Sequence, residues 1–315
     1  MDKRRIGALE VSVGGLGCNN FGWRLDAEQS TAVVHAALDA GITFFDTADV
    51  YGGTKSEEFL GRALAGRRDQ VVIATKFGGR LDDRHRGARH DYVRQAAEAS
   101  LRRLGTDHID LYQQHWPDPD VPLAETLGAL DELVRAGKVR EIGCSNLSAE
   151  QLREAQRAVR GGATRFVSVQ NEYSLLHRTP ERDVFPECAR LGLAFLPYYP
   201  LAAGLLTGKY RRGQPAPEGS RMAAGGRLAE LAAPKFTDEN LALVEALDDF
   251  ATARGHTLLE LAISWLLARP AVALVIAGAT SPAQVRANAG AAGWRLWQAD
   301  LVEIDSIVAP AGATR

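Results

Sequence analysis

The sequence is poor in cysteine and lacks a long run of purely apolar residues. Its 315 residues contain three cysteines, Cys18, Cys144 and Cys188. These are too few and too widely spaced for a disulfide framework or a zinc site, so we expect no metal and a reducing compartment. The uncharged run 270–285 includes proline, glycine, serine and glutamine, and it is shorter than the ~20 apolar residues that cross a bilayer. We therefore expect a cytoplasmic protein with no membrane partner.

The sequence also lacks an excess of charge of either sign. Its formal net charge is −2, which provides no overall field to attract nucleic acid or an anionic membrane. Lys3, Arg4 and Arg5 resemble the start of a signal peptide, but Glu10 and several glycines interrupt the segment that follows. Hydrophobic residues make up 46% and charged residues 24% of the chain, as in an ordinary globular protein with a large core. Nothing in the sequence indicates an oligomeric state.

Short apolar runs alternate with longer amphipathic segments along the whole chain. Three of these segments open with a capping-box pattern, at Asp26 and Gln29, Ser148 and Gln151, and Thr257 and Glu260. The apolar runs are rich in Val, Ile, Leu and Phe, which is typical of parallel strands buried on both faces. They number eight and lie at 13–17, 42–46, 71–76, 108–115, 140–146, 165–173, 193–200 and 271–279.

Eight strand–helix units without a break in composition favour a closed (β/α)8 TIM barrel over an open doubly wound sheet. We expect residues 1–315 to form a single barrel domain, and IGALEVS at 6–12 to add a short N-terminal β-hairpin as a cap. Two segments look irregular. The charged stretch 79–91 predicts a solvated loop that could act as a lid, and 210–235 predicts a long mobile loop.

Polar side chains follow the apolar runs where the strands should end. In barrels of this kind the chemistry gathers at the carboxyl ends of the strands. The second run ends in Asp46 with Tyr51 beyond it, the third ends in Lys76, and the fourth ends in His115. Each residue alone has a structural explanation, as a turn former, a surface residue or an ordinary hydrogen-bonding group. Ionisable side chains gathered at one rim are costly to bury unless they pair, so together they indicate a catalytic site.

These four residues can act as a proton donor with its supporting groups. A free tyrosine has a pKa of about 10, too high for efficient proton exchange near neutrality. We expect the Lys76 ammonium to lower the pKa of Tyr51, Asp46 to keep Lys76 charged, and His115 to orient a carbonyl oxygen. Because no nucleophile with its base and no metal cluster is evident, the set suits carbonyl reduction with hydride supplied by another molecule.

The segment GATSPAQVRAN at 278–288 follows the last apolar run and begins a helix. Ser281 is the expected N-cap, Pro282 takes the first helical position, and Gln284 closes a capping box. Helix N-termini attract phosphate through their free N–H groups and the helix dipole. An ordinary, well-capped helix explains the same pattern equally well.

Together these motifs resemble those of the aldo-keto reductases over nearly the whole chain. The resemblance implies a barrel that transfers hydride between a nicotinamide cofactor and an aldehyde or ketone, or the corresponding alcohol. It implies that Tyr51 is the general acid/base, that Asp46 and Lys76 form an ion pair, and that His115 orients the carbonyl. The matching stretches are GLGCNNFG at 15–22, FFDTADVYG at 44–52, ATKFG at 74–78, DLYQQHWPD at 110–118, GCSNLS at 143–148, VQNEYS at 169–174, YYPLAAGLLTGKY at 198–210 and GATSPAQVRAN at 278–288.

The resemblance also implies a set of cofactor-binding residues and favours NADPH over NADH. Ser145, Asn146 and Gln170 match residues that bind the nicotinamide amide, and Tyr198 matches the aromatic residue that stacks on its ring. The positions that match contacts to the pyrophosphate and the adenosine are Leu201, Gly204, Leu206, Lys209, Gly278, Thr280, Gln284 and Asn288.

The sequence departs from the family pattern at two places. Tyr199 replaces a common serine, and with Trp23 and Trp116 it is expected to line the substrate pocket. Many members carry a lysine or arginine within 278–284 for the 2′-phosphate of NADPH, whereas the nearby cation here is Arg286. The lack of such a cation should weaken the preference for NADPH unless Arg286 or a residue of 210–221 substitutes, and the alternative is an NAD-dependent sugar or alcohol dehydrogenase.

Two further alternatives use the same fold. A nucleotide-binding regulatory subunit that senses redox state would not need the complete Asp46, Tyr51, Lys76 and His115 set. A Schiff-base aldolase would use Lys76 as a nucleophile, but an aspartate partner keeps the amine protonated. For an enzyme of this kind the partner is a small-molecule carbonyl or alcohol, whose identity the sequence does not specify.

Overall fold

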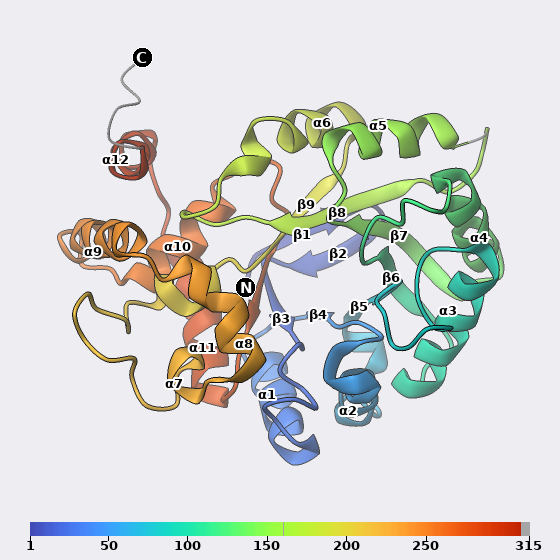
Figure 1. Ribbon diagram of the computed structural model, residues 1–315, viewed down its shortest axis with the longest axis horizontal. Coiled ribbons are helices and arrows are strands. Elements are labelled where there is room, and N and C mark those ends of the chain that lie inside the picture. Colours follow the sequence, from blue (N-terminus) through green and yellow to red (C-terminus); the bar gives the residue numbers. More distant parts are fainter. Residues whose placement is uncertain (160, 310–315) are drawn as a thin grey trace.

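The protein is described by a computed structural model covering residues 1–159 and 161–309. Parallel strands surround a central axis, with helices on the outside (Figure 1). The sheet order is β10-β3-β4-β5-β6-β7-β8-β9, so these eight strands follow the chain around the barrel. The strands are β3 (Gly14–Gly17), β4 (Phe44–Asp46), β5 (Val72–Phe77), β6 (Ile109–Gln114), β7 (Val139–Ser145), β8 (Phe166–Glu172), β9 (Ala194–Tyr198) and β10 (Val275–Gly278).

The barrel closes between β9 and the segment that leads into β10. The Phe195 N–H donates to the Ala271 carbonyl (2.8 Å), and the Ala273 N–H donates to the Phe195 carbonyl (3.1 Å). Each of the eight apolar runs overlaps one of the barrel strands. The predicted (β/α)8 barrel is therefore confirmed.

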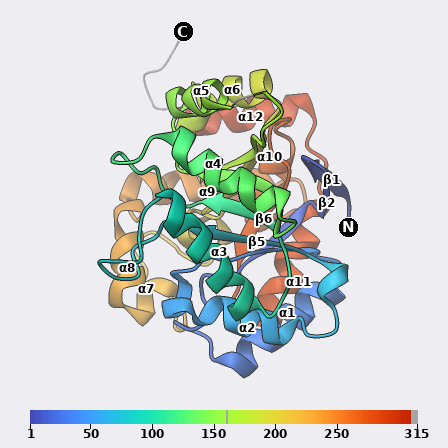
Figure 2. The same ribbon diagram turned by 90° about the vertical axis from the view of Figure 1, so that its right-hand side faces the viewer.

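Helices cover the outside of the barrel, and Figure 2 shows α2, α3 and α4 in front of β5 and β6. The predicted capping boxes are present at Asp26, Ser148 and Thr257, whose side chains accept the N–H of the third residue on. No helix in the described part of the chain is long and apolar enough to span a membrane. The helices are α1 (Ala27–Asp39), α2 (Lys55–Ala63), α3 (His90–Leu104), α4 (Leu123–Arg135), α5 (Ala149–Ala158), α6 (Val184–Leu191), α7 (Arg221–Ala224), α8 (Gly226–Ala232), α9 (Asp238–Thr252), α10 (Leu258–Leu267), α11 (Pro282–Gly290) and α12 (Gln298–Val308).

The expected N-terminal hairpin is present and caps one end of the barrel. Strands β1 (Lys3–Ile6) and β2 (Leu9–Ser12) pair antiparallel, and Gly7 makes the turn at a φ of 56° that favours glycine. Ile6, Leu9 and Val11 belong to one apolar cluster with side chains from inside the barrel, among them Phe44, Ala74, Leu111 and Leu196. The hairpin therefore seals the end of the barrel at which the strands begin.

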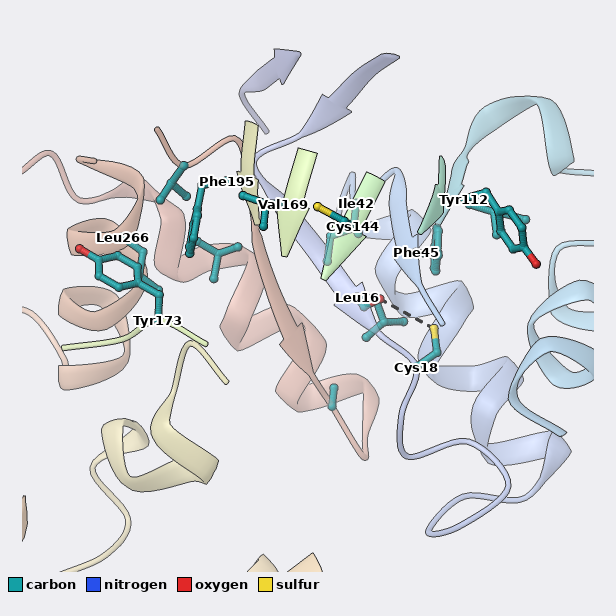
Figure 3. Packing of buried hydrophobic residues seen from close by; sticks show 14 of the residues in the cluster. Leu16, Cys18, Ile42, Phe45, Tyr112, Cys144, Val169, Tyr173, Phe195 and Leu266 are labelled. Carbon is teal, nitrogen blue, oxygen red and sulfur yellow. Dashed lines mark hydrogen bonds between the residues drawn. The ribbon is translucent and has the colours of Figure 1, made fainter. Parts of the chain in front are cut away.

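A second apolar layer lies between the strands and the helices. Figure 3 shows part of it, including Ile42, Phe45, Val169 and Phe195. All three cysteines are free and buried. Phe44 and Phe45 fall in different clusters because successive side chains of a strand point to opposite faces.

Two residues further along several strands, the barrel interior changes from apolar to polar. Phe44 is followed on the same face by Asp46, Ala74 by Lys76, and Leu111 by Gln113. Gly143 of β7 leaves room for this layer, because a Cβ there would lie 2.5 Å from Ser168 Oγ and 3.2 Å from Gln113 Cγ. Because every second residue of a strand points to the same face, the ionisable side chains lie inside the end of the barrel opposite the hairpin.

The two segments that the sequence predicted to be loops differ in secondary structure. Residues 79–89 lack helix and strand, as expected, and α3 begins at His90. The segment 210–235 is not the single long loop that the sequence predicted, because it includes α7, α8 and a 3₁₀ turn at Ala233–Lys235. Ser220 caps α7 by accepting the Ala223 N–H (3.3 Å). A weak N-cap signal within a Gly- and Pro-rich stretch explains why these short helices were missed.

Candidate active site

The loop after β4 carries Tyr51 to the rim of the barrel. It runs beside β5, because the Thr47 N–H donates to the Ala74 carbonyl (2.8 Å) and the Asp49 N–H donates to the Lys76 carbonyl (3.0 Å). Tyr51 then opens a 3₁₀ turn, Tyr51–Thr54. This turn needs glycine at position 52, where φ is 61°. A Cβ there would also lie only 2.2 Å from the Phe21 carbonyl oxygen.

Asp46 and Lys76 form a buried ion pair. Lys76 Nζ donates to Asp46 Oδ1 (2.5 Å) and to the Thr47 carbonyl (2.9 Å). The side chains of Lys76 and Asp46 are 0% and 5% exposed. The other carboxylate oxygen, Asp46 Oδ2, accepts the side-chain amides of Gln170 (2.9 Å) and Gln113 (3.3 Å). The carboxylate is thus held on both oxygens, as a buried charge requires.

The Lys76 side chain stays an ammonium in this environment. Burial works against its charge, but Asp46 and Tyr51 outweigh burial and raise the pKa of Lys76 above its usual value. A protonated amine cannot attack a carbonyl. The geometry therefore argues against the Schiff-base aldolase.

Tyr51 lies between Lys76 and His115. Lys76 Nζ is 5.1 Å from the centroid of the Tyr51 ring, and the Tyr51 and His115 rings meet edge to face with centroids 5.7 Å apart. Tyr51 is half-buried as a residue, with its hydroxyl end among buried groups. The expected net lowering of its pKa is wrong here: burial raises the pKa of Tyr51 by more than the Lys76 ammonium lowers it. The phenol is therefore protonated at neutral pH.

His115 is a neutral imidazole at the end of β6. Its residue is 8% exposed, and burial, followed by the Lys76 charge, lowers the pKa of His115 to about 3. Within residues 1–159 and 161–309, no group bonds its buried Nδ1. Its backbone is fixed, since its N–H donates to the Phe77 carbonyl (2.9 Å) and its carbonyl accepts from Asn146 Nδ2 (2.9 Å). A fixed, neutral imidazole can contact a carbonyl oxygen without competing for the proton.

The four residues expected at the nicotinamide form one hydrogen-bonded chain across β7, β8 and β9. The Tyr198 hydroxyl donates to Asn146 Oδ1 (2.9 Å), Asn146 Nδ2 donates to Ser145 Oγ (3.1 Å), and Ser145 Oγ donates to the Gln170 carbonyl (2.7 Å). Since the Gln170 amide binds Asp46, this chain is continuous with the ion pair. The structure therefore brings these four residues to the same rim as Tyr51.

Several residues of the loop after β9 adopt the left-handed backbone conformation. Tyr199, Ala202 and Ala203 have φ of 50°, 46° and 60°, and Gly204 has φ of 103°. Leu201 precedes the 3₁₀ segment Ala202–Thr207, which contains buried Leu206. A Cβ on Gly204 would lie 3.6 Å from Lys209 Nζ. Non-glycine residues in this region cost ~1–3 kcal/mol each and cluster at ligand clamps, so the loop fits a role in holding the cofactor.

The start of α11 differs from the expected capping box. Ser281 Oγ accepts the Gln284 N–H (3.3 Å), as expected, but Gln284 Oε1 accepts the N–H of Thr280 (2.8 Å) rather than that of Ser281. Gly278 lies in a narrow place beside the β3–α1 loop, because a Cβ there would be 3.3 Å from Asn19 Oδ1 and 3.5 Å from Asn20 Nδ2. Gln284 and Asn288 are four residues apart in α11 and share one side of it, and Thr280, which precedes the helix, is hydrogen-bonded to Gln284.

Arg286 lies away from that side. It lines a cavity together with Met1, Asp2, Val13 and Ala40. These residues belong to the N-terminal end of the chain and to the turn after α1, not to the rim that holds Tyr51. The hypothesis that Arg286 supplies the cation for a 2′-phosphate is therefore not supported by its position.

The expected substrate residues divide into two groups. Trp23 and Trp116 are 53% and 52% exposed, with Trp23 6.0 Å from Tyr51 and Trp116 stacked 5.8 Å from His115 between ring centroids. These two tryptophans flank Tyr51 and His115. Tyr199 packs against Tyr198 at 5.5 Å in the loop after β9, and its charge when ionised would also act on Tyr51.

Several residues of the site were not identified from the sequence. Gln113 binds Asp46, and its place two residues before His115, on the interior face of β6, was the available signal. Asn20 Nδ2 donates to the Ala279 carbonyl (3.2 Å) and ties the loop after β3 to the end of β10. Asp49, within the TADVY stretch, lies buried behind the Tyr51 turn.

The barrel and the ion pair, phenol and imidazole at its rim identify the class of protein to which the chain belongs. Residues 12–309 match the model of the Aldo/keto reductase family. The chain belongs to this family and is an NAD(P)H-dependent oxidoreductase.

Two relatives extend this similarity. The aldo-keto reductase YhdN of Bacillus subtilis (strain 168) is 38% identical over 309 residues, covering 95% of this chain and 91% of that protein. The structure of the glycerol dehydrogenase AKR11B4 from Gluconobacter oxydans is similar with a TM-score of 0.84 at 31% identity, covering 100% of this chain and 97% of that one.

Proposed function

We propose that the protein is a carbonyl reductase in which Tyr51 donates the proton to an aldehyde or ketone oxygen. The observation that carries this proposal is the position of Tyr51 between the Lys76 ammonium and the neutral His115. A protonated phenol beside an ammonium is a proton donor whose conjugate base is stabilised as it forms.

The residues at the rim fit a nicotinamide nucleotide. The Ser145, Asn146, Gln170 and Tyr198 chain would hold the nicotinamide end, the left-handed loop after β9 would follow the pyrophosphate, and Thr280, Gln284 and Asn288 would face the adenosine. When bound, such a cofactor supplies or accepts hydride at C4 of its nicotinamide ring. At the start of α11, Gln284 Oε1 already accepts the N–H and the hydroxyl of Thr280, so a phosphate there would have to displace this side chain.

The chain's own residues account for the movement of the proton. A neutral His115 donates its N–H to the carbonyl oxygen and holds it next to Tyr51. As negative charge develops on that oxygen, the Tyr51 hydroxyl gives up its proton and the Lys76 ammonium stabilises the tyrosinate. Asp46 keeps Lys76 charged, while Gln113 and Gln170 hold Asp46. Because the pKa of Tyr51 is raised, the protonated phenol, which is the proton donor that reduction requires, dominates at neutral pH.

We propose NADPH as the preferred cofactor because two guanidinium groups, those of Arg24 and Arg221, lie near enough to influence each other beside the loop after β9. Burial, and then the charge of Arg221, lower the pKa of Arg24, and Arg24 Nη2 donates to the Gly219 carbonyl (3.4 Å). Arg221 also lies 5.8 Å from the Tyr199 ring centroid. A phosphate between Arg24 and Arg221 would relieve the repulsion between these like charges.

A second candidate is an NADH-dependent alcohol or sugar dehydrogenase. Two observations favour it: residues 278–284 carry no cation, and Arg286 lies in a different cavity. The similar structure is also that of a glycerol dehydrogenase. Under this proposal the partner is again a small-molecule alcohol or carbonyl.

A substrate panel distinguishes the two candidates. Aldehydes, ketones and sugars, with the matching alcohols, would be followed by nicotinamide absorbance with NADPH, NADH, NADP and NAD at pH 7. The reductase predicts a higher kcat/KM for carbonyl reduction with NADPH than for any alcohol oxidation. Faster alcohol oxidation with NAD would instead support the dehydrogenase.

A further inference from the structure

Asp49 is a buried carboxyl group that the mechanism above does not use. The residue is 1% exposed, and among residues 1–159 and 161–309 no side chain donates a hydrogen bond to either Oδ1 or Oδ2, although the neighbouring Val50 N–H favours the ionised form. Its own N–H donates to the Lys76 carbonyl (3.0 Å), and it precedes Tyr51 by two residues. Asp49 therefore belongs to the turn that positions Tyr51 relative to β5, the strand that carries Lys76.

The groups around Asp49 come from α2, α3, β5 and β6. Its charged neighbours are Glu57 on α2, Arg103 on α3 and Lys76 on β5, and the phenols of Tyr92 on α3 and Tyr112 on β6 also face it. Tyr112 belongs to the layer outside the barrel shown in Figure 3. Asp49 thus lies between the barrel wall and α2 and α3.

The neighbouring cations are already engaged. Arg103 Nε donates to Glu57 Oε2 (2.6 Å), and Thr75 Oγ1 donates to Glu57 Oε1 (2.6 Å). Lys76 Nζ is bound to Asp46. Asp49 is therefore left beside Glu57, and the two cations near it are bound to other carboxylates. A buried carboxylate in this position carries a large desolvation cost that its surroundings offset only in part.

The uncharged acid avoids this cost. Burial, followed by the charge of Glu57, raises the pKa of Asp49 to about 8, and Arg103 and Lys76 only partly oppose the rise. At neutral pH the side chain is a carboxylic acid, which tolerates an apolar environment far better than the carboxylate.

We propose that Asp49 is a positioning residue that holds the Tyr51 turn in place only as an uncharged carboxylic acid. The inference rests on the proposed role of Tyr51. When Asp49 ionises, the carboxylate must reach water or a cation, and the turn must move because the side chain is attached to it. The turn is hydrogen-bonded to the strand of Lys76 through the Asp49 N–H. A movement of the turn therefore separates the Tyr51 phenol from the Lys76 ammonium. The expected consequence is a loss of kcat above about pH 8, with cofactor affinity retained.

The first test does not depend on catalysis. Infrared difference spectra of the protein without cofactor would be recorded between pH 5 and 10 for the parent and for Asp49→Asn. We expect a carboxylic acid C=O band that disappears with a midpoint near pH 8 and is absent in Asp49→Asn. A parent spectrum with no such band above pH 6 would overturn the inference and leave the proposed function of Tyr51 untouched.

The second test is the shape of the pH profile. The ratio of kcat at pH 9 to kcat at pH 7 should be several-fold higher in Asp49→Asn than in the parent, because the amide cannot ionise. Asp69→Asn, which changes an exposed aspartate, should leave the ratio unchanged. Equal ratios in the parent and Asp49→Asn would contradict the inference. A higher kcat for Asp49→Ala than for Asp49→Asn at pH 7 would also contradict it, provided that circular dichroism confirms that both variants fold.

Discussion

The Lys76 ammonium lies 2.5 Å from Asp46 Oδ1 in a part of the barrel sealed from water. Lys76 would be costly to bury alone, and the same ammonium stands beside the Tyr51 ring. The ion pair therefore serves two purposes: it permits a charge inside the barrel, and it places that charge where a tyrosinate would form.

Replacing one partner of this pair should damage both stability and turnover. In Asp46→Asn the buried ammonium loses its counter-ion, and breaking a buried pair from one side costs about 3–5 kcal/mol. We expect a lower free energy of unfolding in urea and a kcat reduced by at least tenfold at pH 7. An Asp46→Asn protein with parental stability and kcat would show that the pair is not needed.

The neutral state of His115 predicts a particular dependence on pH. Its folded-state pKa of about 3 lies below the unfolded value of about 6.5. The unfolded chain therefore binds more protons between these values, so His115 contributes stability above about pH 6.5 that is lost as pH falls toward 3. We expect the parent to lose more unfolding free energy between pH 7 and pH 5 than His115→Gln does. Equal losses would mean that His115 titrates normally in the folded protein.

The position of Gln284 predicts a change in cofactor preference. Gln284 lies on the same side of α11 as Asn288, whereas Arg286 lines another cavity. Gln284→Arg should raise the ratio of kcat/KM for NADPH to that for NADH by about tenfold or more, since a guanidinium can bind a phosphate with two hydrogen bonds. Arg286→Gln is the matched control and should not change the ratio. A large effect of Arg286→Gln would reverse this assignment.

Tyr199 should control how fast the cofactor leaves. Its ring lies 5.8 Å from Arg221 Cζ and 5.8 Å from Lys235 Nζ, two cations near the ends of the segment 221–235. Each such contact contributes about 0.5–1 kcal/mol when exposed. We expect Tyr199→Ser to increase the cofactor dissociation rate several-fold in stopped-flow fluorescence, and Tyr199→Phe, which keeps the ring, to remain close to the parent. Similar rates for both variants would show that the ring does not hold this segment.

The strands, and the gathering of Asp46, Tyr51, Lys76 and His115 at one rim, could be predicted because their signals are local. A buried strand such as β4 must be apolar, so a polar residue at its end is conspicuous, and the period of two places Asp46 on the inner face beyond Phe44. The partners of Asp46 were harder to predict, because Gln113 and Gln170 come from strands distant in sequence and amides are common at strand ends.

The pKa of Tyr51 was predicted wrongly for a physical reason. The sequence shows that a lysine should be near the phenol, but not how much water burial removes. In the structure the desolvation of the phenol outweighs the Lys76 charge. The helices α7 and α8 were missed because they are short and lie in a segment rich in glycine and proline, where helix propensity is low.

The most direct test of the account is the turnover of Tyr51→Phe, compared with Tyr173→Phe as a control that removes a phenol bonded to Glu181 in the core. Both variants would be assayed for carbonyl reduction at pH 7 and for cofactor binding by fluorescence. We predict that Tyr51→Phe loses about 10²–10⁴-fold in kcat while it binds the cofactor as the parent does, and that Tyr173→Phe keeps most of its kcat. A Tyr51→Phe protein that reduces the carbonyl within a few-fold of the parental kcat would contradict the central claim.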